Sequence, residues 1–308
     1  MSRLQTIFCA LPLLLFGVTM PSSRPSSYPY ISGDTFRSYC DYAYDELDRS
    51  LNPDSILPGS TIFLKTDYLE QFCCQISPRI RVPYILVTHN SDYAVPGPYT
   101  ALLDDPNLIA WFGQNYDGYK HPKIHPIPIG LANGHWAHGN SKLVRIVQQT
   151  SAHKQYLAYM NFAPETFPLE RGPVFSLFAN AHFCYRTSSK SFANYLRELT
   201  TAHFSISPRG NGADTHRLWE SLYLNTVPIV HSSSLDSLYK DLPVLIVDDW
   251  TIVTEKFLTE KKELFANQSF NREKIYMDYW IALINASKAF THKQPENLVF
   301  ERAKVPED

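Results

Sequence analysis

Residues 202–230 read AHFSISPRGNGADTHRLWESLYLNTVPIV, and this stretch decides the fold. The apolar run 202–207 predicts a buried strand, the glycine-rich residues 208–214 predict a loop, and residues 215–224 predict a helix. Residues 227–230 predict the next strand. A strand, a helix and a second strand in this order form a βαβ unit, which builds a parallel sheet.

At about 100° per residue, the predicted helix separates into a polar arc and an apolar arc. The polar arc holds His216, Arg217, Glu220 and Ser221. The apolar arc, which should face the core, holds Leu218, Trp219, Leu222 and Tyr223. The polar arc therefore begins beside the glycine-rich loop and reaches a carboxylate one turn further on.

The glycine-rich loop is a candidate phosphate site. Gly210 and Gly212, on either side of Asn211, permit positive φ and the close approach of a ligand to the backbone. Asp214 or Thr215 can cap the helix, whose first N–H groups suit an anion. The spacing is neither the Walker A pattern nor the dinucleotide fingerprint, so a plain glycine turn before an amphipathic helix remains the alternative.

The charged residues of this segment fit the same interpretation. Arg209 and Arg217 are fixed cations that can hold phosphate oxygens bidentately. His216 is a candidate for contact with phosphate or sugar, and Glu220 can accept hydrogen bonds from a ribose diol. Together they predict a binding site for the diphosphate and ribose of a nucleotide.

Residues 207–230 also resemble the exostosin-type glycosyltransferases, family 47 and its relatives, over a long ordered pattern. Asn225 departs from the glycine common in that family, but Asn tolerates the left-handed conformation that ends a helix. The resemblance extends more weakly to about residues 60–255, through residues 87–93, 111–115, 127–133, 235–239 and 242–244.

The resemblance implies a GT-B architecture, in which two Rossmann-like halves face a cleft and the C-terminal half binds most of the donor. It implies a glycosyltransferase that moves a sugar from a nucleotide sugar to a hydroxyl acceptor, with a glycan or glycoconjugate as the acceptor. Inversion at the anomeric carbon, and leaving-group stabilisation by Arg side chains and a helix N-terminus without a metal or other cofactor, follow from the same resemblance. A non-catalytic glycan- or nucleotide-binding module with this fold is the alternative.

Short apolar runs elsewhere predict an α/β protein with parallel sheets in two halves. The predicted strands are 61–65, 82–88, 107–111 and 123–127 in the first half, and 156–160, 202–207, 227–230 and 244–247 in the second. The predicted helices are 67–75, 171–180, 191–199, 215–224, 235–239, 254–265 and 273–290. Polar loops follow several strands, where open parallel sheets bind their ligands.

One such loop supplies the candidate base for the acceptor hydroxyl. His89 and Asp92 follow the predicted strand 82–88 and should face the cleft. We favour Asp92, although an Asp beside Ser and Asn is also a common turn former.

The domain organisation follows from these patterns. Residues 1–30 read as a signal peptide or short membrane anchor with a Ser/Pro spacer. This predicts the secretory pathway or a membrane-associated protein, in an ER- or Golgi-type lumen if the source is eukaryotic. A buried N-terminal helix is the alternative. With the resemblance, residues 31–150 are expected to form the acceptor-side half and residues 151–290 the nucleotide-sugar half, while residues 291–308 read as a polar tail.

The composition and the remaining motifs bear on other classes of protein that the chain could represent. The formal charge of -2 over 308 residues gives no sign of nucleic-acid binding, and no apolar run reaches about 20 residues. His135 and His138 have i, i+3 spacing but no evident third ligand, and no G-x-S-x-G elbow supports a hydrolase. Cys40, Cys73, Cys74 and Cys184 permit disulfides or buried thiols.

Overall fold

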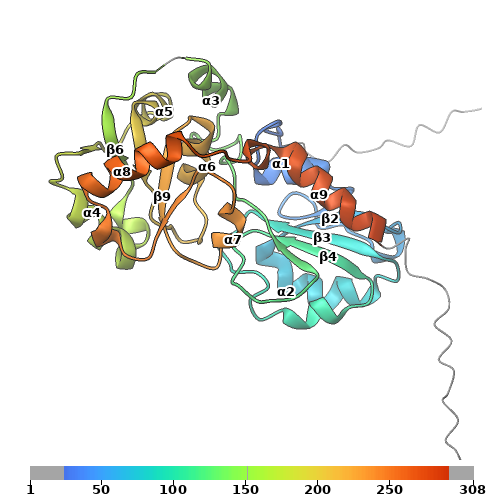
Figure 1. Ribbon diagram of the computed structural model, residues 1–308. Helices are drawn as coiled ribbons and strands as arrows, with labels where there is room; N and C mark the ends of the chain where they lie inside the picture. Colours follow the sequence, from blue (N-terminus) through green and yellow to red (C-terminus); the bar gives the residue numbers. More distant parts are fainter. Residues whose placement is uncertain (1–23, 151, 291–308) are drawn as a thin grey trace, which may run out of the picture.

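The computed structural model describes residues 24–150 and 152–290, which form two α/β halves, each built on a parallel five-stranded sheet (Figure 1). The first sheet has the order β1-β2-β3-β4-β5, and the second has the order β10-β9-β8-β6-β7. Strand bounds are β1 Tyr42–Tyr44, β2 Ser60–Lys65, β3 Tyr84–His89, β4 Leu108–Gly113, β5 Ile124–Pro126, β6 Tyr156–Met160, β7 Cys184–Arg186, β8 Ala202–Ile206, β9 Val227–His231 and β10 Leu245–Val247. The predicted class, two parallel-sheet halves facing a cleft, is confirmed.

The helices also follow the predicted order. Their bounds are α1 Gly33–Tyr39, α2 Leu69–Gln71, α3 Ser141–Gln148, α4 Pro168–Phe178, α5 Phe192–Thr200, α6 His216–Tyr223, α7 Asp236–Tyr239, α8 Glu255–Ala266 and α9 Met277–Phe290. The helix expected over residues 67–75 is part of a longer helical segment, residues 66–79, in which 3-10 and π turns flank α2. The helices α1 and α3 and the three-residue strands β1 and β7 were not predicted. The two strands are too short to show an alternating pattern, whereas α3 is strongly amphipathic and its period could have located it.

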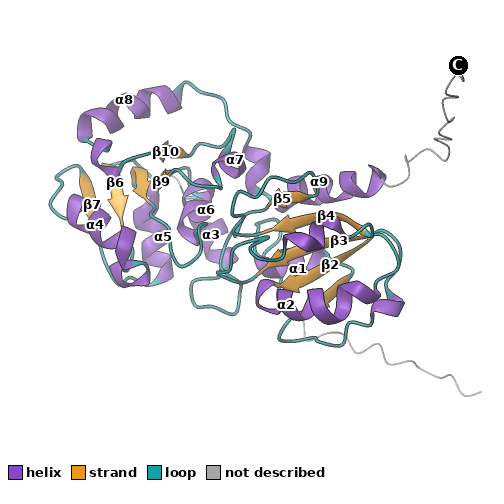
Figure 2. Ribbon diagram, turned by 90° about the horizontal axis from the view of Figure 1, so that it is seen from below, coloured by secondary structure: helices purple, strands orange, loops and turns teal. Residues whose placement is uncertain are grey.

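Alternation along the strands divides the core of the first half into two layers. In β2, Phe63 joins the cluster that contains Trp280 of α9, whereas Ile62 and Leu64 pack with Phe72 on the opposite face. Figure 2 shows the consequence, with α9 on one side of the sheet and the α2 segment on the other.

Helix α9 therefore belongs to the first half in space, although it comes last in the described chain (Figure 1). The expected second domain, residues 151–290, includes this helix, whereas the structure returns it across the first sheet to contact β4 and α1. An amphipathic helix pattern does not say which sheet the helix covers, so only the tertiary structure assigns it.

The N-terminal boundary also differs from the expectation of a spacer over residues 1–30. Residues 1–23 lie outside the described residues, but residues 24–30 are packed against the first half. Ser27 is buried, with its backbone N–H bonded to Thr35, and Tyr30 lies in the core beside Tyr223 and Tyr276. The first half therefore includes residues 24–30.

The βαβ unit that decided the fold is as predicted. Leu218, Trp219, Leu222 and Tyr223 of α6 are all buried in the core. Asn225 has a φ of 55°, the left-handed conformation expected where the helix stops. In the second sheet the chain order reverses between the neighbouring strands β6 and β8, and this is the point at which such sheets bind ligands.

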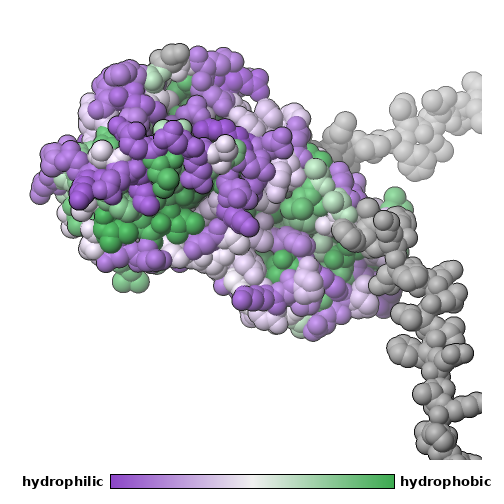
Figure 3. Space-filling model, in the orientation of Figure 1, coloured by the Kyte–Doolittle hydropathy of each residue, from purple (hydrophilic) through white to green (hydrophobic). Residues whose placement is uncertain are grey.

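The described surface is mostly hydrophilic on the face shown in Figure 3, with apolar areas on both lobes. None of the helices in the described ranges is both long and apolar enough to cross a membrane. The four described cysteines are free thiols, and of these Cys184 is buried.

Candidate active site

A cleft of about 660 Å³ lies where β6 and β8 adjoin, between the two halves. The loop after β6, the loop after β8 and the start of α6 form its wall on the side of the second half. The first half contributes Asp92, Ile129, Ala137 and His138. The cleft is therefore at the carboxyl ends of the strands, as the topology predicts.

Arg217 lies in the wall of this cleft, in the first turn of α6. Its Nε donates to the carbonyl of Asn161 at 3.0 Å, and its guanidinium lies 5.5 Å from the ring centroid of Phe162. Its Nη1 is buried and has no hydrogen-bond partner within the described chain. No carboxylate of the described residues forms an ion pair with it at 4.0 Å or less, so the group retains capacity for an anion.

Arg171 of α4 is a second cation in the cleft, and the sequence analysis did not identify it. Its side chain donates to the carbonyls of Arg209, at 2.7 Å, and Ala163, at 3.2 Å. Burial, and then the nearby charge of Arg217, lower the pKa of Arg171 to about 10. Two guanidiniums brought this close repel each other, and a bound anion would relieve the repulsion.

The glycine-rich loop is placed differently from the prediction. Arg209 turns back on its own loop, donating to the carbonyls of Gly210 and Asn211, and lines a neighbouring cavity rather than the cleft. Neither glycine of this loop has positive φ. Instead each allows close packing, because a Cβ would lie 3.2 Å from Arg171 at Gly210 and 2.8 Å from Asn115 at Gly212.

Glu220 lies at the inner end of the cleft and is buried. Its Oε2 accepts a hydrogen bond from the Tyr195 hydroxyl at 2.7 Å. Burial raises the pKa of Glu220 to about 7, although the hydrogen bond from Tyr195 and the charge of Arg217 oppose the shift. The structure therefore brings Glu220 and Arg217 together, as the helical spacing predicted.

The start of α6 has no side-chain cap. Asp214, a predicted cap, is buried and accepts instead from Ile129 N–H, Trp219 Nε1, Thr215 N–H and the Tyr239 hydroxyl. The unused N–H groups at the helix start lie beside Thr215 and His216, which both line the cleft. This arrangement suits a negatively charged ligand.

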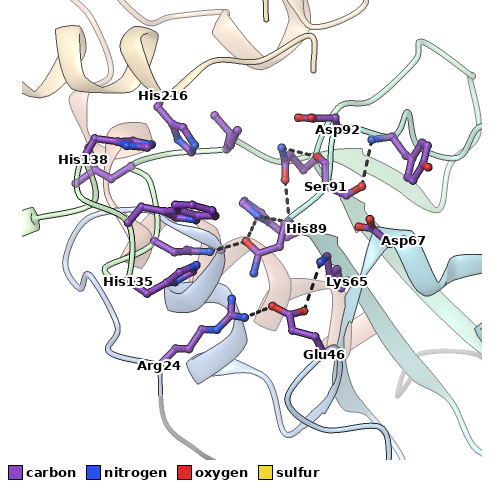
Figure 4. A pocket seen from close by; sticks show the side chains of 18 residues that line it. Arg24, Glu46, Lys65, Asp67, His89, Ser91, Asp92, His135, His138 and His216 are labelled. Carbon is purple, nitrogen blue, oxygen red and sulfur yellow. Dashed lines mark hydrogen bonds and ion pairs between the residues drawn. The ribbon is translucent and has the colours of Figure 1, made fainter. Parts of the chain in front are cut away.

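A second cavity, of about 630 Å³, opens from the same place into the first half (Figure 4). Four residues line both cavities: Asp92, Ile129, His138 and His216. The two cavities therefore adjoin, and Asp92 and His216 lie at their junction.

His216 has a defined tautomer at this junction. Its Nδ1 donates to the carbonyl of Gly130 at 2.8 Å, because a carbonyl can only accept. Burial lowers the pKa of His216 to about 4, so the ring is neutral near pH 7 and Nε2 carries a lone pair. Within the described chain Nε2 has no hydrogen-bond partner, and it can accept from a ligand hydroxyl.

His89, a predicted catalytic residue, has both ring nitrogens engaged. Nε2 donates to the carbonyl of Pro128 at 3.1 Å, and Nδ1 accepts from the Asn90 N–H at 2.7 Å. The side chain is buried, and burial lowers its pKa to about 4. This geometry is that of a residue that shapes the loop after β3 rather than one that exchanges a proton.

Asp92, the other predicted catalytic residue, is exposed at the junction of the two cavities, facing His216 from the opposite half (Figure 4). Its carboxylate has no hydrogen bond or ion pair in residues 24–150 and 152–290. The structure thus brings Asp92, Arg217 and Glu220 to one cleft, as the sequence analysis expected. No group of three or more His, Cys, Asp or Glu side chains among these residues is arranged to hold a metal ion.

Comparison with known proteins gives distant likenesses. No family model matches the chain, and no curated protein matches it. One similar solved structure is a crystal structure of the GtfA/B complex; the likeness has a TM-score of 0.38 at 9% identity and covers 76% of this chain and 58% of that one. Another, the pneumococcal O-GlcNAc transferase GtfA in complex with UDP and GlcNAc, has a TM-score of 0.32 at 11% identity, covering 75% and 52%. The chain thus spans little more than half the length of each.

Proposed function

We propose that this protein is a glycosyltransferase that uses a nucleotide-sugar donor. The observation that carries the proposal is the pair Arg171 and Arg217, which line one cleft without a carboxylate partner in the described chain, beside the uncapped start of α6. Cations and a helix N-terminus in the wall of one cleft fit a diphosphate, whose charge grows as it leaves. Glu220, one turn further along α6, is placed for the ribose.

The proposed reaction is a direct displacement. The acceptor hydroxyl oxygen attacks the anomeric carbon and forms the new glycosidic bond, while the bond to the diphosphate oxygen breaks and its electron pair leaves with the diphosphate. Asp92 takes the hydroxyl proton, and the neutral His216 accepts a hydrogen bond from a second, neighbouring hydroxyl of the acceptor, which orients the acceptor. Attack on the face opposite the leaving group gives inversion. Arg171, Arg217 and the helix start stabilise the leaving diphosphate, so this mechanism assigns no step to a metal.

The family-level proposal, an exostosin-type transferase acting on a glycan, rests on the motif at residues 207–230. The rival is a glycan- or nucleotide-binding module with the same fold, which would bind both ligands without turnover. A panel of nucleotide sugars tests the proposal. First, thermal shift should identify the nucleoside diphosphate that raises the unfolding midpoint. Release of that diphosphate in the presence of glycoside acceptors should then be measured; binding without release in any combination would favour the module.

A further inference from the structure

The cavity in the first half has a composition that restricts what it can bind. We propose that it holds an uncharged pyranose, with the sugar ring against Trp136 and no carboxylate, sulfate or phosphate on that ring. The inference rests on the proposed function, since it names the class of acceptor for the same site.

An exposed tryptophan forms one side of this cavity. Trp136 is 57% exposed and yet lines the cavity. Its ring stacks on His138, with centroids 6.3 Å apart, and lies against His135 at 5.0 Å. The two neighbours fix the orientation of the indole, so its apolar face is already in place for the C–H groups of a sugar ring. His138 also lines the donor cleft, which places this ring close to the junction.

The cations around the cavity already have carboxylate partners. Arg24 pairs with Glu46 and lies 3.5 Å from Asp34, and Lys65 lies 3.6 Å from Glu46. His135 faces the same Asp34 at 3.7 Å. An anionic sugar would have to compete with these carboxylates for each cation.

The remaining charges in the cavity are negative. Asp67 and Asp92 line it, and neither has an ion pair or a side-chain hydrogen bond among residues 24–150 and 152–290. The lining carries Arg24 and Lys65 against Glu46, Asp67 and Asp92, so its carboxylates outnumber its arginine and lysine side chains by one. Free carboxylates accept hydrogen bonds from sugar hydroxyls and repel a uronate.

Asp67, in the helical segment after β2, and Asp92, in the loop after β3, follow neighbouring strands. Figure 4 shows both at the same side of the cavity, with Lys65 between Asp67 and Glu46. Asp92 is reserved for the reacting hydroxyl in the proposed mechanism. Asp67 is therefore the residue that determines specificity, through the hydroxyl groups of the same ring.

The test measures glycoside binding without any donor. Methyl β-glucoside and methyl β-galactoside are titrated against methyl β-glucuronide and methyl β-galacturonide, with saturation-transfer NMR as the readout. The neutral sugars should bind the full chain at least about fivefold more tightly, from roughly 1 kcal/mol of charge repulsion. Asp67→Lys should bring the ratio close to one. Glu70→Lys makes the same charge change in the same helical segment outside the cavity and should leave the ratio unchanged.

Trp136 is tested in the same titration. Trp136→Ala should weaken binding of every glycoside about tenfold, and Trp136→Phe should restore part of it. Tyr119→Ala is the control, because Tyr119 is exposed in the first half and does not line this cavity. Equal binding of uronides and neutral sugars, or full binding by Trp136→Ala, overturns the inference.

The same preparations distinguish this inference from the proposed function. Nucleoside diphosphate binding is measured by thermal shift on each variant, and should be unchanged by substitutions at residues 67 and 136. Diphosphate binding without any glycoside binding rejects the neutral-sugar site and leaves the transferase proposal in place. Glycoside binding with the stated preference but no diphosphate binding rejects the transferase proposal.

Discussion

The Oδ2 atom of Asp214, in the second half, accepts a hydrogen bond from the backbone N–H of Ile129, in the first half, at 2.8 Å. The contact lies directly beside the cleft, because Asp214 and Ile129 both line it. His216 crosses the same boundary to the carbonyl of Gly130 at 2.8 Å. The two halves are therefore joined by partly buried polar contacts at the point where their cavities meet, and the relative placement of Asp92 and Arg217 depends on these contacts.

Asp214→Asn should destabilise the protein by about 1–3 kcal/mol, the cost of an unsatisfied buried polar group. All four partners of the carboxylate are hydrogen-bond donors. The NH₂ group of Asn is also a donor, so in either orientation of the amide it would face another donor. Urea unfolding at pH 7.5 measures the loss. Asp248→Asn, at an exposed aspartate of the second half, is the control, and equal stability of the two variants would contradict the proposed role.

Arg217→Ala and Arg171→Ala should each weaken nucleoside diphosphate binding by about 1.5–3 kcal/mol, the range for hydrogen bonds to charged groups. Arg217→Lys should restore only part, because an ammonium lacks the planar fork. Arg209→Ala is the matched control, since Arg209 lines a different cavity and should retain most of the affinity. Calorimetric titration measures the diphosphate affinity of each variant. If Arg209→Ala loses more diphosphate affinity than Arg171→Ala, the phosphate is bound by the glycine-rich loop instead.

Asp92→Asn should reduce turnover by about 100-fold or more with little change in diphosphate affinity, because a base acts only as the acceptor proton leaves. His216→Gln should raise the KM for acceptor more than it lowers kcat, since its proposed role is to hold a neighbouring hydroxyl of the acceptor. His89→Gln tests whether His89 is the base in place of Asp92. If His89→Gln abolishes turnover in a variant whose unfolding midpoint is unchanged, the assignment to Asp92 is wrong.

The raised pKa of Glu220 predicts a pH dependence of stability. Burial moves this pKa from 4.5 to about 7, so the folded state holds a proton that the unfolded state releases between these values. The stabilisation is complete below about pH 4.5 and is lost as the pH rises through about 7. Between pH 5 and 7.5, the unfolding free energy of Glu220→Gln should therefore decrease by about 1–3 kcal/mol less than that of the wild type. An unchanged slope in this variant would show that Glu220 does not hold the proton.

Truncation tests the N-terminal boundary. Removing residues 1–23 should leave the described fold intact, whereas removing residues 1–30 should destabilise it. The second deletion takes away Arg24, Ser27 and Tyr30, and with them the ion pairs at the cavity and part of the core. Differential scanning calorimetry of the two proteins provides the measurement. Equal midpoints would support the original interpretation of residues 24–30 as a spacer.

The sequence by itself determined the local pattern of this protein. Apolar runs located eight of the strands, with their ends correct to within two residues. The period of α6 separated Arg217 and Glu220 from the buried Leu218 and Trp219. Both predictions succeeded because strand and helix geometry are local. Asn225 ended the helix as its side chain predicted.

Only the tertiary structure decided which side chains meet. Arg171 enters the cleft from α4, far from the motif in the chain, and α9 returns to the first half because it covers an apolar face of that sheet. Asp214 does not cap the helix as predicted, because in the folded protein its carboxylate is buried among four donors from both halves. Local spacing sets the direction of a side chain on its own element. The partner that it meets depends on how distant elements pack, because burial is a property of the whole fold.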